Sequence, residues 1–499
     1  MSFQIKKFKF SNETIVLSKP NSFHNNHTFT ILTGRNGIGK SRLLVSLISN
    51  LLSDDLYDEE LDKYNLNKII AVSNIKNDKF PSTKRHSEKY FYIGNKSNFP
   101  TSYNDRFSVF KNILINKNLN NFNASNALNY LGFESIIIYD FSKPPMMQSE
   151  MTRRYSNYIE CYEKYFNLFN SDILPSSFRN KLNSLFKNIL LDKNEKYNTL
   201  FEDDEIDLNP NDRLNFNQYN INSQYDKHIN KQLNDFFKNK INEEELFFLD
   251  CVVKSDILLK KISYDHFHKL FTIVLENNIL NYLKNFQYNI RSIHKTNLLT
   301  DISFLLEIDL LKIRNISLIS LHNNNEIRFF NLSSGEQSLF NILLGISSVI
   351  ENNSLICIDE PEVNLHPEWQ NEFIIKLQNI FDHITGCHFI IATHSPQIVS
   401  GLMSKNGFIV DMENNITYNI EDYSKKSSDY QLAHLFGYPG YNNEYLIRIA
   451  LTLLSKITNQ NKLDANDNKN LVLLNSFKND LPENDPVNFL IDQINSLVI

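Results

Sequence analysis

The chain has 499 residues, of which 41% are hydrophobic and 22% charged, which is ordinary usage for a globular protein. This length allows two to four structural units with a large buried core and excludes a single small module. Lys and Arg total 51 against 57 Asp and Glu, a formal net charge of −6, which excludes a global basic field of the kind that draws proteins to nucleic acid. Any nucleic-acid surface must therefore be local.

The four cysteines predict neither a zinc site nor a disulfide framework, because they stand far apart: Cys161, Cys251, Cys357 and Cys387. The first ten residues place lysines between apolar side chains and do not resemble a signal peptide. No later run approaches the roughly 18 apolar residues of a membrane span. We therefore expect reduced thiols, a cytoplasmic location and no membrane contact.

The strongest local signal is a phosphate-binding loop. A strand-like apolar run from Thr28 leads into Gly-x-x-x-x-Gly-Lys-Ser and then into a helical pattern, the context that a P-loop requires. Glycines let the backbone curl around phosphate, the lysine adds a positive charge near the β- and γ-phosphates, and the serine can ligate Mg²⁺. The predicted nucleotide contacts are Gly34, Arg35, Asn36, Gly37, Ile38, Gly39, Lys40 and Ser41. The alternative is a glycine turn before a helix.

A second element runs from Ser354 to Pro367 and contains two adjacent carboxylates. Its short, continuous apolar run predicts a buried central strand. Asp359 at the strand's end can hold Mg²⁺ through water, and Glu360 beside it is placed to polarise an attacking water. The structural alternative is a pair of carboxylates that cap the next turn.

A third element, from His388 to Pro396, is another predicted buried strand and ends in His394. A lone histidine is usually structural. However, the carboxyl end of a strand in a parallel sheet faces the ligand crevice, so we favour a role for His394 in sensing the γ-phosphate.

The stretch from Leu332 to Phe340 predicts a helix whose start presents backbone N–H groups to an anion. Ser333 or Ser334 is a good N-cap, Gly335 would let a phosphate approach the backbone, and Glu336 favours the helix dipole. An apolar stripe follows. By itself the segment could be an ordinary helix cap.

In this order, the elements resemble the ABC-type ATPases of the SMC, RecF and OLD class. The resemblance covers residues 1 to about 115 and 300 to about 420. It implies an α/β fold, an ABC-type P-loop ATPase head with a mixed β-sheet core, and it implies ATP and Mg²⁺ as cofactors. It also implies a homodimer or higher homo-oligomer in which the signature of one subunit closes over the ATP of another. The signature residues are Ser334, Gly335, Glu336 and Gln337.

Four segments are expected. Residues 1–115 form an ATPase N-lobe with the P-loop, and 116–300 a compact helical insertion rich in Asn, Lys, Phe and Tyr. Residues 301–420 form the C-lobe with signature, carboxylates and switch histidine, and 421–499 a helical tail. In the tail, Asp485 before Pro486 is typical of an N-cap followed by proline at the first helical position.

One departure from the family concerns the glutamine that usually follows an early strand and connects Mg²⁺ to the regulatory surface. No Gln occurs between Gln4 and Gln148. After the strand-like run from Ile69, the nearest polar substitutes are Ser73 and Asn74, of which Asn74 is more simply a turn residue. What replaces the glutamine is left open.

The closest family in appearance is the ATPase subunit (PtuA) of the Septu antiphage systems, which also accompanies some retrons. The residues that carry this resemblance are Ala71–Asn74, Asp78–Pro81, Tyr90–Gly94 and the terminal Asn484–Val487. It implies a separate HNH-type, PtuB-like nuclease as partner, and a retron reverse transcriptase with its RNA/DNA product as a further candidate. About 80 residues follow position 420, and they contain a single histidine, His434, so we expect no nuclease domain within this segment.

Two other classes remain open. A DNA-repair or chromosome-maintenance ATPase of the SMC/RecF type would use the same site to clamp DNA. An ABC transporter's nucleotide-binding subunit fits less well, because Ser-Gly-Glu-Gln at residues 334–337 departs from the transporter-like Ser-Gly-Gly-Gln and a large insertion separates the lobes.

Overall fold

The computed structural model describes residues 3–19, 27–52, 66–75, 78–81, 89–94, 107–115, 121–142, 180, 283, 285–291, 297–307, 311–402, 406–459 and 462–498. Most of the expected helical insertion therefore lies outside the described residues. The chain divides into two compact units. One comprises Met1–Tyr139, Gln287–His294 and Asn315–Ile499, and the other comprises Asp140–Phe286 and Lys295–Arg314.

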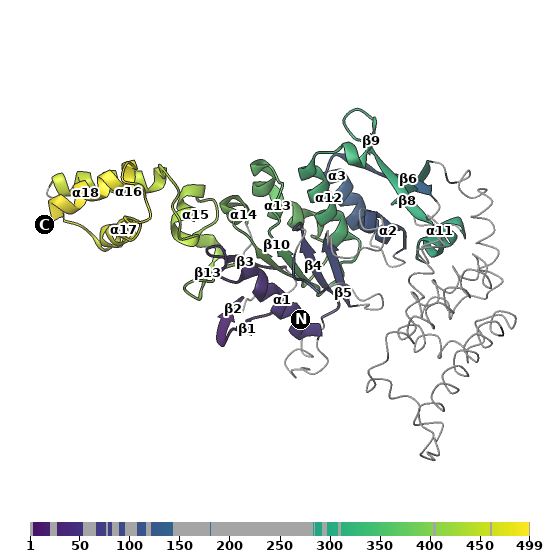
Figure 1. Ribbon diagram of the computed structural model, residues 1–499, viewed down its shortest axis with the longest axis horizontal. Coiled ribbons are helices and arrows are strands. Elements are labelled where there is room, and N and C mark those ends of the chain that lie inside the picture. Colours follow the sequence, from purple (N-terminus) through teal and green to yellow (C-terminus); the bar gives the residue numbers. More distant parts are fainter. Residues whose placement is uncertain are drawn as a thin grey trace, which may run out of the picture. The chain divides into compact units, whose positions relative to one another are not determined.

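The centre of the first unit is a seven-stranded sheet in the order β13-β12-β3-β11-β10-β4-β5 (Figure 1). Neighbouring strands from β12 to β5 pair in parallel, and β13 pairs antiparallel with β12, so the sheet is mixed as expected. The strands are β3 (Thr28–Thr33), β4 (Ile69–Ser73), β5 (Tyr90–Gly94), β10 (Leu355–Asp359), β11 (His388–Ala392), β12 (Gly407–Asp411) and β13 (Ile416–Asn419).

Every residue of β3, β4, β10, β11 and β12 is buried. Strands covered on both faces read as continuous apolar runs, which explains why the sequence showed no alternation here. In parallel strands the carboxyl ends lie at one edge of the sheet, and Asp359 is in register with Ala392 on one side and Ser73 on the other. The expected edge of polar residues is thus formed by segments far apart in sequence.

Helix α1 (Lys40–Leu52) follows β3 directly and buries Leu43, Leu44, Leu47 and Ile48 in the same core cluster as residues of the sheet. The spacing of these four residues is that of one helical face. Further helices of the ATPase region are α12 (Ser334–Ser347), α13 (Pro367–Ile380) and α14 (Pro396–Gly401). Each of these begins after a residue that caps it through its side chain: Ser333, His366 and Ser395.

The remaining strands form two smaller sheets. Strands β1 (Lys7–Phe10) and β2 (Glu13–Val16) make an antiparallel hairpin. Strands β6 (Phe133–Ser142), β7 (Phe286–Asn289), β8 (Lys312–Ser320) and β9 (Glu326–Arg328) form a four-stranded sheet in the order β7-β6-β8-β9. Helices α2 (Ser108–Ile115), α3 (Asn121–Tyr130) and α11 (Asn297–Glu307), with the short turns η6 (Phe329–Asn331) and η7 (Ile420–Asp422), complete this part of the chain.

His388 at the start of β11 connects three segments in the core. Its Nδ1 accepts from the Ile5 N–H at 3.1 Å, and its Nε2 lies 2.9 Å from the Thr30 hydroxyl, which itself donates to the Leu17 carbonyl at 2.7 Å. Burial lowers the pKa of His388 to about 3. The ring is therefore neutral, with its proton on Nε2.

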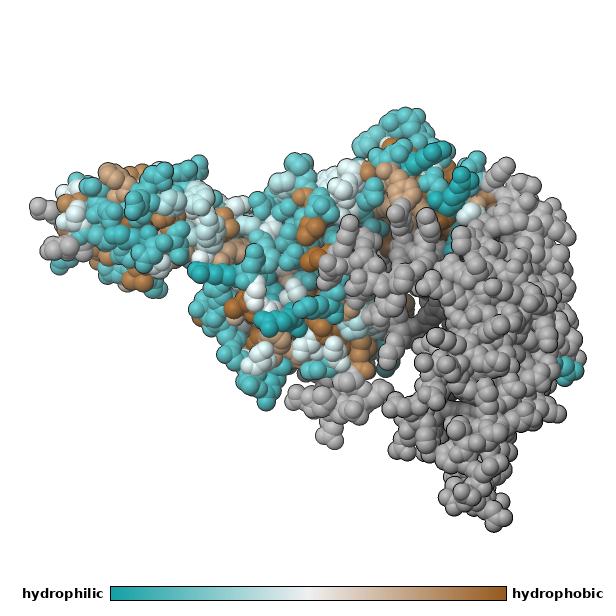
Figure 2. Space-filling view, viewed as in Figure 1, coloured by the Kyte–Doolittle hydropathy of each residue, from teal (hydrophilic) through white to brown (hydrophobic). Residues whose placement is uncertain are grey.

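The C-terminal tail is helical, as predicted: α15 (Ser428–Leu435), α16 (Glu444–Thr458), α17 (Ala465–Ser476) and α18 (Pro486–Val498). The last three share a hydrophobic core with Ala433 of α15, and this core includes Leu446, Leu453 and Ile491. Asp485 Oδ1 accepts from the Val487 N–H at 2.8 Å at the start of α18, which confirms the predicted cap. Figure 2 shows this tail as mainly hydrophilic, with scattered apolar side chains. Across the described ranges, none of the helices combines the length and the hydropathy needed to span a bilayer.

Candidate ATP site

The loop between β3 and α1 has the backbone of a phosphate loop. Gly34 and Gly39 have φ angles of +134° and +113°, which L side chains rarely adopt. Lys40 is 4% exposed, and its ammonium donates to the carbonyls of Gly34 at 2.7 Å and Arg35 at 3.3 Å. Burial lowers the pKa of Lys40 to about 8, although nearby carboxylates, Glu360 first among them, oppose the shift. The lysine is a desolvated cation, and phosphate oxygens would satisfy it better than carbonyls do.

Ser41 and Asp359 meet as expected of two groups that share Mg²⁺. The Ser41 hydroxyl donates to Asp359 Oδ1 at 2.9 Å. Burial raises the pKa of Asp359 to about 6, opposed by the Ser41 hydrogen bond. Hard oxygen donors this close fit Mg²⁺, which is usually held by one or two protein ligands together with substrate phosphates and water. Within the described ranges no group of three His, Cys, Asp or Glu side chains could hold a metal.

Glu360 follows β10 in a conformation that few residues other than glycine adopt, with φ at +47°. Its N–H donates to the Ala392 carbonyl at 2.9 Å, which ties the end of β10 to the end of β11. Its Oε1 lies 3.7 Å from His394 Nε2. Strained backbone of this kind is often found at functional sites, because the surroundings must hold it in place.

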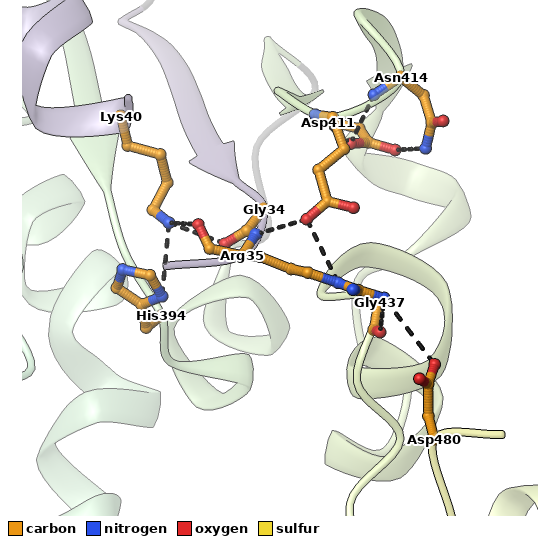
Figure 3. A network of polar contacts seen from close by, with 9 residues as sticks. Gly34, Arg35, Lys40, His394, Asp411, Asn414, Gly437 and Asp480 are labelled. Atoms are coloured by element: carbon orange, nitrogen blue, oxygen red, sulfur yellow. Dashed lines mark hydrogen bonds and ion pairs between the residues drawn. The ribbon is translucent and has the colours of Figure 1, made fainter. Parts of the chain in front are cut away.

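His394 connects the lysine with the glutamate. Its Nδ1 lies 3.4 Å from Lys40 Nζ (Figure 3). Burial, with a smaller contribution from the Lys40 charge, lowers the pKa of His394 to about 4, so the ring is neutral at pH 7. Because the ammonium can only donate, Nδ1 accepts and the proton lies on Nε2, on the side of Glu360.

Arg35 in the phosphate loop contacts residues from the other end of the chain (Figure 3). Its N–H donates to Glu413 Oε1 at 2.8 Å, and its guanidinium donates to the Gly437 carbonyl at 2.9 Å and lies 3.9 Å from Asp480. The Arg35 side chain is 59% exposed, so the last contact contributes little to stability. These contacts hold the side chain of Arg35 in place. The side chain takes no part in the hydrogen bonds made by Lys40.

The signature residues lie at the start of α12. Ser333 is the N-cap and forms a capping box with Glu336, and Gln337 Nε2 donates to the Leu332 carbonyl at 2.8 Å. Ser334 is exposed, and within the described chain its hydroxyl has no hydrogen bond. No hydrogen bond or ion pair among the described residues joins 333–337 to 34–41.

The packing around position 335 requires glycine there, which the sequence did not show. A Cβ at this position would lie 2.6 Å from the Asn364 carbonyl and 3.2 Å from the Trp369 ring. The turn after β10 therefore packs directly against the start of α12.

Of the substitutes for the missing glutamine, Ser73 accepts from the Ile75 N–H at 3.2 Å and so shapes the turn after β4. Asn74 has a buried Nδ2 with no hydrogen-bond partner within the described part of the chain. Its assignment to the nucleotide site stays a prediction.

The structure brings together Lys40, Ser41, Asp359, Glu360 and His394, whereas no hydrogen bond among the described residues joins the signature to the phosphate loop. Glu362 is not among the predicted site residues, although it accepts from the His394 N–H at 2.5 Å. Its position two residues after Glu360 was the available signal. Glu413 gave no signal, because it meets Arg35 from 378 positions away.

Comparison with protein families matches residues 155–400 to the model described as "AAA domain, putative AbiEii toxin, Type IV TA system". The matched range contains the signature, β10 and His394. The phosphate loop lies before it.

Three relatives are similar over parts of the chain. A retron Vc95 probable ATPase from Vibrio cholerae is 32% identical over 26% of this chain and 26% of its own length. A retron Ec83 probable ATPase from Escherichia coli is 29% identical over 18% of each chain, and a Septu protein PtuA from Bacillus mycoides is 31% identical over 16% of this chain and 12% of its own. The chain thus spans about a quarter or less of the length of these relatives.

Among solved structures, the Smc head domain with a coiled coil and joint derived from Pyrococcus yayanosii aligns with 62% of this chain and 55% of that chain, at 10% identity and a TM-score of 0.18. This score is too low to compare the two folds in detail. The chain carries an ATPase domain, with a phosphate loop beside a largely parallel sheet, and parts of it are similar in sequence to two retron probable ATPases and to Septu protein PtuA.

Proposed function

We propose that this chain binds Mg²⁺-ATP and hydrolyses it to ADP and phosphate. The observation that carries the proposal is the convergence of Lys40, Ser41, Asp359, Glu360 and His394 at the carboxyl edge of the sheet, within the hydrogen bonds and short contacts given above. Phosphoryl transfer needs positioning and charge stabilisation more than covalent chemistry, and these groups supply both.

In the proposed reaction the loop N–H groups and Lys40 hold the β- and γ-phosphates and stabilise the charge that develops on them. Bound Mg²⁺ would neutralise part of that charge, and Ser41 and Asp359 are the residues that would hold it. Glu360 accepts a proton from the attacking water, and we assign the His394 Nε2–H, which lies 3.7 Å from Glu360 Oε1, as a donor to the γ-phosphate. This assignment is tested by phosphate release from ATP by the purified chain.

We also propose that two copies close head to head around ATP, with Ser334 and Gly335 of one copy at the γ-phosphate held by the other. The exposed, unpartnered Ser334 at the start of a capped helix supports this arrangement. Mass measurement with and without ATP tests it: the expected result is a dimer, or a multiple of dimers, that requires nucleotide. A mass that does not change with nucleotide, in a protein that hydrolyses ATP, would contradict ATP-dependent closure.

The proposed biological role is antiphage defence in the cytoplasm, in which nucleotide state controls a separate PtuB-like, HNH-type nuclease. The names of the relatives support this proposal, since they are retron ATPases and Septu proteins. A retron reverse transcriptase with its RNA/DNA product is the other proposed partner. Purification together with the products of neighbouring genes, followed by mass measurement, tests it.

The second candidate is a DNA-repair or chromosome-maintenance ATPase. It would bind DNA in a nucleotide-dependent manner without any companion nuclease, which distinguishes it from the defence role. In either case we propose the same four segments: N-lobe 1–115, insertion 116–300, C-lobe 301–420 and tail 421–499.

A further inference from the structure

Glu362 lies in the turn after β10, two residues beyond Glu360, and one of its carboxylate oxygens accepts a backbone hydrogen bond. Its Oε1 accepts from the His394 N–H at 2.5 Å. The Thr393 hydroxyl also hydrogen-bonds to this carboxylate and accepts from the Ser395 N–H at 3.0 Å. These hydrogen bonds connect the turn after β10 to the segment that follows β11.

The other oxygen of Glu362 is different. Oε2 is buried and has no hydrogen-bond partner among the described residues. Burial raises the pKa of Glu362, whereas the His394 N–H lowers it. Burying a carboxylate with one oxygen unsatisfied is unfavourable, so this side chain must contribute something that a smaller residue would not.

The contribution follows from where the two strands end. The Glu360 N–H to Ala392 carbonyl bond fixes one backbone point, and the Glu362 bond fixes a second point two residues further along each segment. Between these two points lie the side chains of Glu360 and His394, which are 3.7 Å apart. Two hydrogen bonds define the orientation of a segment, whereas a single hydrogen bond would leave the segment free to rotate.

We propose that Glu362 is a positioning residue that holds His394 between Lys40 and Glu360 through the His394 backbone N–H. This role rests on the proposed ATP hydrolysis for its consequence, but the contact itself does not. Because Glu362 acts through His394 in this proposal, its loss should affect turnover more than ATP affinity.

Three variants of Glu362 distinguish the effect of its side-chain length from the effect of its charge. Glu362→Gln keeps an oxygen at the same distance and removes the charge, Glu362→Asp keeps the charge and withdraws it by about 1.5 Å, one bond length, and Glu362→Ala removes both. Glu368→Ala is the matched control, because Glu368 is an exposed carboxylate on the next helix.

We expect Glu362→Gln and the control to turn over ATP within about threefold of the unchanged protein. Glu362→Asp and Glu362→Ala should lose about 10- to 100-fold in kcat with ATP affinity nearly unchanged, as expected when a catalytic segment moves by about 1 Å. Hydrogen exchange at the His394 amide gives a readout that does not depend on hydrolysis: protection should persist in the Gln variant and fall at least about tenfold in the Asp and Ala variants.

Equal losses in the Gln and Ala variants, with the amide still protected, would show that the charge acts directly and would overturn the positioning role. Full turnover in all three variants would overturn it as well. An unchanged protein without ATP turnover would instead refute the proposed function, and amide exchange would still decide whether Glu362 holds His394. If Glu362→Ala does not fold, the Gln and Asp pair decides the question.

Discussion

The carboxyl edge of the sheet and the start of α12 are the two regions that we propose bind anions, and they satisfy their polar groups differently. At the sheet edge, Lys40 donates to loop carbonyls and Ser41 to Asp359, so the binding groups hold one another in place. At α12, the capping box between Ser333 and Glu336 satisfies the helix end, while Ser334 is exposed.

One chain assembles the first region by itself, whereas we propose that the second acts on ATP held by another copy. Parallel strands in register bring the ends of β3, β10 and β11 to one edge of the sheet. The helix start has no such connection to the phosphate loop within the described residues. Lys40→Ala and Glu360→Gln test the first region, Ser334→Arg and Gly335→Ala test the second, and the His388 variant tests the core beneath the sheet.

The largest effect is expected for Lys40→Ala, which should abolish tight ATP binding. The variant removes a charge-assisted contact to the phosphates from a desolvated position. Titration with a labelled ATP analogue measures it, with Lys7→Ala on the exposed hairpin as control. An ATP affinity equal to that of the unchanged protein would show that Lys40 does not contact ATP.

Glu360→Gln should bind Mg²⁺-ATP and lose on the order of 10²- to 10⁴-fold in hydrolysis, the range expected for loss of a general base. Loss of a negative charge near the triphosphate should also let the ATP-bound dimer accumulate. Turnover measured beside retained ATP in the purified variant tests both statements. Near-normal turnover would shift the role of base to another group.

Ser334→Arg should leave ATP binding by a separated subunit largely intact and block hydrolysis, because its effect falls on the ATP of a neighbour. Mixing it with Lys40→Ala protein tests the arrangement. If the signature acts in trans, some mixed dimers regain one working site and a fraction of turnover returns. Formation of mixed dimers is verified by differential tagging, and dimers without any recovery would contradict the arrangement.

Because His388 is buried and neutral, the free energy of unfolding should decrease at acidic pH. Its pKa is about 3 in the folded chain against an ordinary value of 6.5, so the unfolded chain binds a proton that the folded chain excludes. The contribution of His388 to the free energy of unfolding is therefore complete above pH 6.5. It declines by up to a few kcal/mol as pH falls toward 3.

Urea unfolding at several pH values in this window measures the slope. His388→Gln should reduce it without abolishing it, because burial also lowers the pKa of His27, His394 and His434. A slope unchanged by the substitution would assign the acid sensitivity to those other groups.

The smallest effect is expected for Gly335→Ala. The methyl group would lie 2.6 Å from the Asn364 carbonyl, a backbone atom that cannot rotate away. Overpacking of this kind costs about 1–3 kcal/mol, against a gain of about 1 kcal/mol in helix propensity. Thermal unfolding beside Gly345→Ala, where a flexible Ile93 side chain is the neighbour, should show the larger loss for Gly335→Ala.

Much of the site was predictable from local sequence. The loop from Gly34 to Ser41, the carboxylates after β10 and His394 each follow a buried strand, and such strands appear as short apolar runs. The helical tail and the cap at Asp485 were also predictable, because capping acts over two or three residues. Most of the expected insertion lies outside the described residues and stays a prediction.

The sequence by itself determined which residue types carry the chemistry and at which strand ends they lie, because spacing and capping are local properties. Only the tertiary structure decided which of these residues meet: Glu362 with His394, Glu413 with Arg35, and Asn364 with Gly335. The physical reason is that strand order and the packing of turns depend on long-range burial, and no local pattern records which segments the core will bring side by side.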